Sequence, residues 1–302
     1  MRLPSTKQLQ YFVALADIGH FGKAADASFV SQSAFSNAIK ELENNLQTQL
    51  VDRTKRQVTI TATGQEIATQ ARLVLRDIEQ LVDMASEGRE PLTGDLRLGV
   101  IPTIAPFLLP HVLPKLRRAF PELRLYLVED QTQRIVERLL GGELDVILLA
   151  LPWDIRGIET EVLFDDQFCL AVREGTERVD PDNYRFNRLA ADSIILLEDG
   201  HCLRDHALAA CKIRNTQKVQ PFAASSLLTL IEMVDADMGI TFLPEMAKGS
   251  SLLRSTKVQL HPLGEGSHRQ IGLGWRKGSS RVEEFKLLGD FFKEHPGKVG
   301  SN

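Results

Sequence analysis

The chain has 302 residues, of which 25% are charged and 43% are hydrophobic, and its formal net charge is −4. This length predicts two or three domains with a sizeable core, and the slightly negative charge does not by itself indicate a nucleic-acid partner. Three cysteines in so long a chain argue against a secreted disulfide scaffold and favour a reducing compartment. The sequence shows neither the apolar run of a signal peptide nor that of a membrane span, so we expect a cytoplasmic protein without membrane contact.

The first part of the chain shows three short helical patterns in succession. The first covers residues 6–16, with Thr6 as its expected cap, and a second short helix is expected over residues 21–27. The third begins near Ser31, and its apolar positions recur every three or four residues along one face. The opposite face of this third helix carries short polar side chains and one cation, which suit contacts with base edges. They are Gln32, Ser33, Ser36, Asn37 and Lys40.

A basic segment follows the third helix and is predicted to form a small hairpin over residues 53–61. Arg53, Lys55 and Arg56 cluster there, and cations of this kind neutralise DNA phosphates. We therefore expect residues 1–65 to form a winged helix-turn-helix that binds double-stranded DNA. The same pattern also fits a three-helix packing module with a solvated polar face.

These motifs together resemble the DNA-binding domain of the LysR-type transcriptional regulators. The matching stretches are Ala24-Ala25-Asp26, Val30-Ser31-Gln32-Ser33-Ala34-Phe35-Ser36, Ile39-Lys40-Glu41-Leu42-Glu43 and Ile60-Thr61-Ala62-Thr63-Gly64. The chain differs from the family's usual pattern at Ser33, Asn37 and Ala62, where proline, arginine and proline are common. Without that arginine, Lys40 is expected to carry more of the phosphate contact.

A longer helical pattern over residues 64–88 carries a heptad seam. Its apolar positions repeat at intervals of four and three residues and are Ile67, Ala71, Val74, Ile78, Leu81 and Ala85. Such a seam can pack within its own domain, but its strict period between two modules favours a partner helix, as in the dimerisation helix of the same family. We therefore expect a linker helix and hinge over residues 66–91 and a homo-oligomer, either a dimer or a tetramer.

From residue 92 onward, apolar strands and helices alternate. Strands are expected over residues 96–101, 123–128, 146–150, 164–172, 194–197, 239–243 and 271–275, and helices over 105–119, 133–140, 227–234 and 282–292. Continuous apolar strands separated by helices predict an α/β fold with parallel sheets that are covered on both faces.

This second pattern resembles the periplasmic-binding-protein-like effector domain of the LysR-type regulators. The resemblance implies a redox-sensing or ligand-sensing domain over residues 92–302. Subdomain I would span about residues 92–165 and 269–302, and subdomain II about residues 166–268. Ligands in such folds bind at the carboxyl ends of strands, in the cleft between the subdomains.

Two of the three cysteines, Cys202 and Cys211, lie nine residues apart in one helical pattern. In an unbroken helix their thiols would point to opposite faces, so a disulfide between them would require the helix to unfold. Cys202 lies near the expected helix N-terminus beside His201 and Arg204, an environment that favours a thiolate. The pair has the geometry of a redox switch. Alternatively, both thiols are small apolar core residues, or Cys202 and His206 are metal ligands.

Polar side chains that follow predicted strands are candidates for the cleft. Thr103 and Thr132 each follow such a strand, and each hydroxyl is either a ligand donor or a routine helix cap. Arg269 precedes the last predicted strand and is either a cleft residue or a surface cation. Cys169 alternates with apolar neighbours and is expected in the core.

Within the LysR-type regulators, residues 197–205 together with Cys211 resemble the signature of the hydrogen-peroxide sensors, the OxyR family. Further matching stretches are Ile101-Pro102-Thr103, Gln131-Thr132 and Gly239-Ile240-Thr241-Phe242-Leu243-Pro244. The resemblance implies that Cys202 reacts with peroxide and that Cys211 resolves the product as a disulfide. It also implies that peroxide is oriented and cleaved with the help of Thr103, Thr132, Gly200, His201, Asp205 and Arg269.

The sequence therefore predicts a peroxide-responsive DNA-binding regulator that is not an enzyme and uses no cofactor or metal. Its expected partners are promoter DNA, hydrogen peroxide as the signal, and RNA polymerase. One alternative is a LysR-type regulator that binds a small organic ligand reversibly in the same cleft. DNA binding that depends on redox state when no metabolite is present would argue against it. The other alternative is a thiol peroxidase with an incidental N-terminal module. DNA binding that changes gene expression would argue against a peroxidase.

Overall fold

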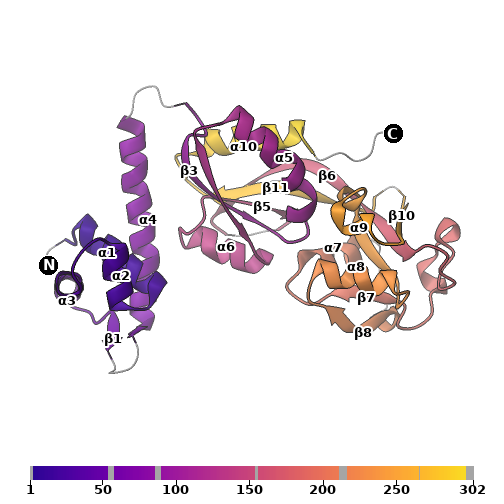
Figure 1. The fold of residues 1–302 in the computed structure, drawn as a ribbon, viewed down its shortest axis with the longest axis horizontal. Helices are drawn as coiled ribbons and strands as arrows, with labels where there is room; N and C mark the ends of the chain where they lie inside the picture. Colours follow the sequence, from indigo (N-terminus) through magenta and orange to yellow (C-terminus); the bar gives the residue numbers. More distant parts are fainter. Residues whose placement is uncertain are drawn as a thin grey trace. The chain divides into compact units, whose positions relative to one another are not determined.

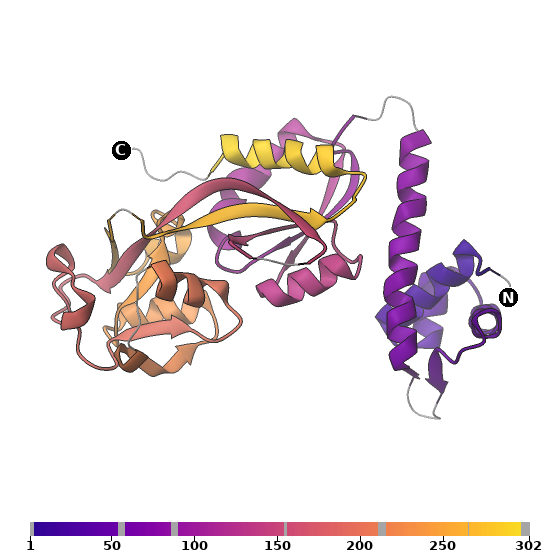
Figure 2. The same ribbon diagram turned by 180° about the vertical axis from the view of Figure 1, so that it is seen from behind.

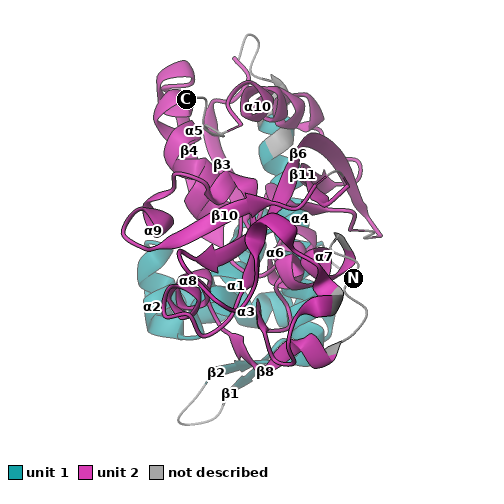
Figure 3. Cartoon of the chain, turned by 90° about the vertical axis from the view of Figure 1, so that its right-hand side faces the viewer, with its two compact units in different colours: residues 1–89, 141–143 teal, residues 90–140, 144–302 magenta. Residues whose placement is uncertain are grey.

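The computed structural model describes residues 3–53, 58–85, 90–153, 156–210, 216–264 and 266–296. It divides into two compact units (Figure 3). The N-terminal unit comprises residues 1–89 with 141–143, and the C-terminal unit comprises residues 90–140 with 144–302. Of the helices in the described ranges, none is both long and apolar enough to cross a membrane.

The N-terminal unit consists of three short helices, a hairpin and one long helix (Figure 1). The bounds are α1 Thr6–Ile18, α2 Phe21–Ala27, α3 Gln32–Leu46, β1 Val51–Arg53, β2 Val58–Ile60 and α4 Ala62–Ala85. Ser5, and not the predicted Thr6, caps α1, because its hydroxyl accepts from the Gln8 N–H while the Gln8 side chain accepts from the Ser5 N–H. The apolar helix faces meet in one core, in which Phe12 and Phe35 are fully buried.

The two halves of α4 differ in what covers their apolar side chains. Ala71 is 3% exposed, and Ile67 packs against the core of the N-terminal unit. Farther along the helix, Ile78 is 37% and Leu81 is 66% exposed. Packing within the chain's own unit therefore accounts for only the first half of the predicted seam, and the second half presents an apolar face.

The C-terminal unit is built on a curled seven-stranded sheet with helices on both sides (Figures 1 and 2). In spatial order the strands are β10 Val258–Pro262, β6 Ile158–Arg173, β11 His268–Arg276, β5 Val146–Leu151, β3 Gly94–Val100 and β4 Leu123–Glu129, with β9 Thr241–Pro244 also paired to β6. A separate parallel pair is formed by β7 Ile194–Leu197 and β8 Val219–Ala224. The helices are α5 Ala105–Ala119, α6 Thr132–Leu140, α7 Cys202–Ala210, α8 Leu227–Asp235, α9 Ser251–Arg254 and α10 Val282–Glu294.

The sheet is mixed, so the prediction of parallel sheets is correct for only part of it. β3 pairs in parallel with β4 and β5, as expected for strands joined through helices. β11 instead runs antiparallel to both β5 and β6, and β6 runs antiparallel to β9 and β10. The prediction failed here because an antiparallel strand covered on both faces has the same apolar pattern as a parallel one.

The long strands β6 and β11 connect the two subdomains of this unit. β6 is 16 residues long; its first half pairs with β11, and its second half, from Phe168 onward, pairs with β9. Just before this change of partner, Asp166 of β6 lies opposite Arg269 of β11 in the register. The antiparallel pairing of β6 and β11 therefore places a charged pair at the junction between the subdomains.

Candidate functional site

A small pocket in the C-terminal unit brings most of the predicted site residues together. Its lining consists of Ile101, Pro102, Thr103, Gln131, Thr132, Gly200, His201 and Cys202. These residues follow β3, follow β4 and begin α7, so the pocket lies at the carboxyl ends of two parallel strands, where α/β folds bind their ligands.

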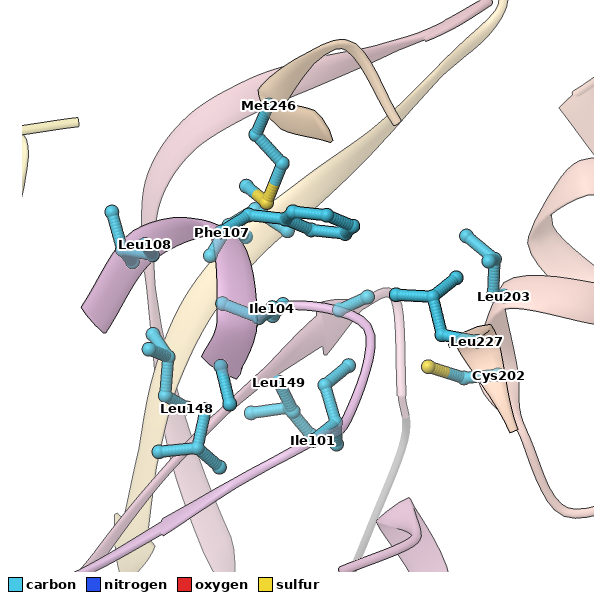
Figure 4. Packing of buried hydrophobic residues seen from close by; sticks show 14 of the residues in the cluster. Ile101, Ile104, Phe107, Leu108, Leu148, Leu149, Cys202, Leu203, Leu227 and Met246 are labelled. Carbon is cyan, nitrogen blue, oxygen red and sulfur yellow. The ribbon is translucent and has the colours of Figure 1, made fainter. Parts of the chain in front are cut away.

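Cys202 is the first residue of α7, and only 3% of its surface is exposed. Its sulfur points away from α7 toward Ile101 and Leu149 (Figure 4). Burial raises the pKa of the thiol, whereas the Arg269 charge and the Thr132 hydroxyl lower it. The thiol is therefore largely protonated at neutral pH, and the groups that favour its ionisation come from other segments of the chain.

The predicted source of positive charge at this thiol was wrong. Arg204 pairs with Asp199 at 3.3 Å, and the cation that lowers the pKa of Cys202 is Arg269. The expectation of a thiolate favoured by His201 and Arg204 failed for a physical reason. Sequence shows which residues neighbour a cysteine along the chain, but neither its burial nor the charges that distant strands bring to it.

Arg269 lies within β11 and its side chain is fully buried, so the surface-cation alternative is excluded. Its Nε donates to Asp166 Oδ2 at 3.0 Å, its Nη1 to Thr103 Oγ1 at 3.0 Å and its Nη2 to the Thr103 carbonyl at 2.9 Å. Burial raises the pKa of Asp166, while the Arg269 charge and a hydrogen bond from the Met246 N–H lower it. This ion pair fixes both the hydroxyl and the carbonyl of Thr103.

The two threonine hydroxyls line the pocket beside the Cys202 thiol. Because Arg269 donates to Thr103 Oγ1, the Thr103 hydroxyl hydrogen is left to donate elsewhere. Thr132 Oγ1 is buried and interacts with the Cys202 thiol, whose pKa it lowers. The Thr132 hydroxyl can therefore pair with the thiol or with a small polar ligand in the pocket. The helix-cap alternative is excluded for Thr103, since Ile104 is the N-cap of α5.

Gly200 and His201 form the turn that leads into α7. Gly200 has φ +98°, and a Cβ at this position would lie 2.8 Å from Oε1 of Gln131, so the turn requires glycine. His201 is 7% exposed, and its Nε2 lies 3.4 Å from Nε2 of Gln131. Sequence reasoning missed Gln131 as a site residue, although it stands beside Thr132 in a motif that had been recognised.

The carboxylate that the sequence suggested for the site, Asp205, differs from the one that the structure places there, Asp166. The side chain of Asp205 is exposed and does not line the pocket. Asp166, which sequence reasoning missed, is instead the buried partner of Arg269. No clear signal in the sequence pointed to it, because Asp166 stands in the polar run Asp165-Asp166-Gln167 and nothing there marks it as buried.

The described residues include the third cysteine, Cys169, and the two side chains of the metal alternative, Cys202 and His206. Cys169 is 4% exposed in β6, and burial raises its pKa to about 11, as expected for a core thiol. In the described part of the chain, no group of three or more His, Cys, Asp or Glu side chains could hold a metal ion. Cys211, the expected partner of Cys202, lies outside the described residues.

The residues predicted to contact DNA lie on α3 and in the hairpin. Ser31 caps α3, and its hydroxyl lies 3.1 Å from that of Ser33. Gln32, Ser33 and Lys40 are exposed, and Ser36 is half-buried. In the hairpin, Arg53 ends β1, while Lys55 and Arg56 lie outside the described residues.

Two family models match the chain. The bacterial regulatory helix-turn-helix protein of the lysR family matches residues 6–65, and the LysR substrate binding domain matches residues 89–297. HTH-type transcriptional regulator EstR of Acinetobacter baylyi is 39% identical over 96% of this chain and 97% of its own length. DNA-binding transcriptional dual regulator OxyR of Escherichia coli is 39% identical over 94% of this chain and 93% of its own length.

Solved structures of OxyR proteins share the fold. A cysteine-to-aspartate variant of full-length OxyR from Pseudomonas aeruginosa has a TM-score of 0.80 and 29% identity, with all of both chains covered. A cysteine-to-serine mutant of OxyR from Corynebacterium glutamicum, bound to H₂O₂, has a TM-score of 0.65 and 31% identity over 97% of this chain and 93% of that chain. The predicted fold, a winged helix-turn-helix followed by a two-subdomain α/β regulatory domain, is confirmed. The chain belongs to the LysR family of transcriptional regulators and, within it, to the OxyR group.

Proposed function

We propose that this chain is a transcription regulator that responds to hydrogen peroxide through Cys202. The observation that carries the proposal is the pocket in which the Cys202 thiol meets two threonine hydroxyls, one held by Arg269 and one that lowers the pKa of the thiol. Each oxygen of H₂O₂ both donates and accepts hydrogen bonds, so the molecule can pair with both hydroxyls. The H₂O₂-bound OxyR of Corynebacterium glutamicum supports the same assignment.

In the first step the Cys202 thiolate attacks one peroxide oxygen. An S–O bond forms and the O–O bond breaks; the sulfur is oxidised to a sulfenic acid, and the leaving oxygen takes up a proton to become water. Thr103, Thr132 and His201 hold the peroxide by hydrogen bonds. Arg269 stabilises the thiolate directly and stabilises charge on the leaving oxygen through Thr103.

In the second step Cys211 condenses with the sulfenic acid, which forms a disulfide and releases water. α7 is helical from Cys202 to Ala210, and a helix of nine residues rises about 13.5 Å, whereas disulfide Cα atoms lie within about 7 Å. The disulfide therefore requires α7 to unwind. Cys202 and Leu203 belong to the core of the C-terminal unit, so unwinding repacks that core and changes the surface of the unit.

The response is read out on DNA. We infer that α3 enters the major groove through Gln32 and Lys40 and that Arg53, Lys55 and Arg56 contact phosphates. The apolar later turns of α4 form the contact between subunits of a dimer or tetramer, which works with RNA polymerase in the cytoplasm. Each cycle consumes one peroxide, so the chain acts as a sensor and not as an enzyme. The domain limits expected from the sequence, at residues 65, 91 and 165–166, stay predictions.

A regulator of the same family that binds an organic ligand is the second candidate. The relative EstR is as similar to the chain as OxyR of Escherichia coli is, and its name does not mention peroxide. The chemistry of the pocket supports the first candidate, because its lining includes a thiol whose pKa responds to a buried cation and to a hydroxyl.

Peptide mapping of the peroxide-treated protein tests this proposal. The reduced chain receives one equivalent of H₂O₂, free thiols are alkylated, and each cysteine is followed by mass spectrometry. We expect a Cys202–Cys211 disulfide with Cys169 still reduced. In a Cys211→Ser variant we expect the sulfenic acid of Cys202, with faster over-oxidation to sulfinic acid. Oxidation of Cys169 before Cys202 would refute the assignment.

A further inference from the structure

We propose that Gln131 is a positioning residue that holds the His201 imidazole in the peroxide pocket and so controls the rate at which Cys202 is oxidised. This inference rests on the proposed reaction with hydrogen peroxide. It concerns a residue to which neither the sequence motif nor the reaction scheme gave a role. Gln131 lines the pocket together with His201, and the two residues come from different segments, one after β4 and one before α7.

The backbone of Gln131 is held on both sides, so its side chain extends from a rigid point. Its N–H donates to Asp130 Oδ1 at 2.9 Å, and its carbonyl accepts from the Ile135 N–H at 3.0 Å in the first turn of α6. The next residue, Thr132, supplies the buried hydroxyl of the pocket. The amide of Gln131 and the hydroxyl of Thr132 are therefore positioned by the same helix start.

The amide of Gln131 lies against Gly200 and reaches the edge of the His201 ring. Its Oε1 and Cδ lie 2.8 Å and 3.1 Å from the point where a Cβ of Gly200 would stand. Its Nε2 lies 3.4 Å from His201 Nε2. In this orientation of the Gln131 amide, whose nitrogen only donates, His201 Nε2 accepts the hydrogen bond and Nδ1 carries the ring proton.

This contact is what restrains the imidazole. Within the described ranges, the contact with Gln131 is the only side-chain hydrogen bond of His201. His201 is 7% exposed, so a ring that loses this partner has no ready access to bulk water in exchange. It can then rotate or change tautomer inside the pocket. Misplacing a group that contacts a reacting molecule by about 1 Å slows a reaction up to about a hundredfold.

Two substitutions of similar size separate the hydrogen bond from simple space filling. Gln131→Met keeps the length of the side chain and removes its donor, whereas Gln131→Glu keeps its shape but only accepts in its ionised form. Gln133→Met is the matched control, because Gln133 lies two residues farther along in the first turn of α6 and its exposed amide donates to Glu137 at 2.9 Å. All variants are made in the full chain, and tryptophan fluorescence verifies their folding.

Two measurements are made on each variant. The rate of Cys202 oxidation by H₂O₂ is followed by rapid quenching and peptide mass spectrometry from pH 6 to pH 9. The imidazole ¹⁵N shifts of His201 are recorded on protein labelled at histidine and assigned with His201→Asn. Gln131→Met should react about tenfold more slowly than wild type, with Gln133→Met unchanged. In wild type His201 Nε2 should be unprotonated, and in Gln131→Glu it should carry a proton.

Two outcomes overturn the proposal. One is a Gln131→Met rate within twofold of wild type over the whole pH range. The other is a slower Gln131→Met whose His201 shifts match those of wild type, because Gln131 would then act only through packing. If wild-type Cys202 fails to react with H₂O₂, the proposed function itself fails. The ¹⁵N shifts still decide whether Gln131 sets the tautomer of His201 in that case.

Discussion

Replacing Arg269 with methionine should destabilise the C-terminal unit and slow the reaction of Cys202 with peroxide. The side chain of Arg269 is fully buried and donates three hydrogen bonds to oxygen atoms of Asp166 and Thr103. Methionine fills a similar volume but leaves the Asp166 carboxylate, which is 4% exposed, without its cation. Breaking one side of a buried ion pair costs about 3–5 kcal/mol of unfolding free energy.

Urea unfolding followed by tryptophan fluorescence measures this loss in the correct unit. Both tryptophans, Trp153 and Trp275, belong to the C-terminal unit, so the signal does not report on the helix-turn-helix. With a urea slope of about 2–3 kcal/mol/M, the unfolding midpoint should fall by roughly 1–2.5 M. The control is Arg124→Met, which removes an exposed ion pair with Asp95 at 2.6 Å and should leave the midpoint almost unchanged.

A double variant separates stability from chemistry. Arg269→Met combined with Asp166→Leu removes both buried charges and should recover much of the lost stability. It should still react slowly with peroxide, because Thr103 has lost the donor that orients its hydroxyl and Cys202 has lost the charge that lowers its pKa. If Arg269→Met unfolds at the same urea concentration as Arg124→Met, the reasoning about the buried pair is refuted.

Four further predictions concern the thiol, the turn before α7 and the later turns of α4. Because burial raises the pKa of Cys202 above its ordinary value of 9.0, the oxidation rate should rise with pH from 7 to 9 in rapid-quench experiments, and a flat profile would contradict this shift. Because the pKa of Cys202 is raised in the folded state, the free energy of unfolding should fall as pH rises above about 9. A lower urea midpoint at pH 10 than at pH 8 would show this loss. Gly200→Ala should slow oxidation, since its Cβ meets Gln131 at 2.8 Å and φ is +98°; a wild-type rate would mean that the turn adapts. Ile78→Asp should shift the protein toward monomer in sedimentation velocity, and an unchanged oligomer would exclude the later turns of α4 from the subunit contact.

Local signals in the sequence predicted the elements around the site well. The bounds of α5 and β7 agree with the predicted ranges 105–119 and 194–197, and α7 begins at Cys202 close to where a helix N-terminus was expected. Apolar periodicity and caps are properties of neighbouring residues, so they can be recognised without knowledge of the fold. The ends of two strands and the start of a helix, which together line the pocket, were therefore predicted from the sequence.

Contacts between distant segments could not be predicted in the same way. Arg269 bonds with Asp166 across 103 residues and with Thr103 across 166 residues. No periodicity links such positions, and their pairing follows from the antiparallel register of β6 and β11, a direction that the apolar pattern does not reveal. For the same reason the burial that raises the pKa of Cys202 was not anticipated, and only the resemblance to a known family favoured the cleft over the surface for Arg269.

The most direct test of the account compares promoter activity in cells that carry wild type, Cys202→Ser or Cys169→Ser, before and after a low dose of hydrogen peroxide. Cys169→Ser is the matched control, because it removes another buried thiol of the C-terminal unit that does not line the pocket. The account predicts that wild type and Cys169→Ser change promoter output after peroxide and that Cys202→Ser does not. A full response from Cys202→Ser would contradict the account and leave reversible binding of an organic ligand as the better explanation.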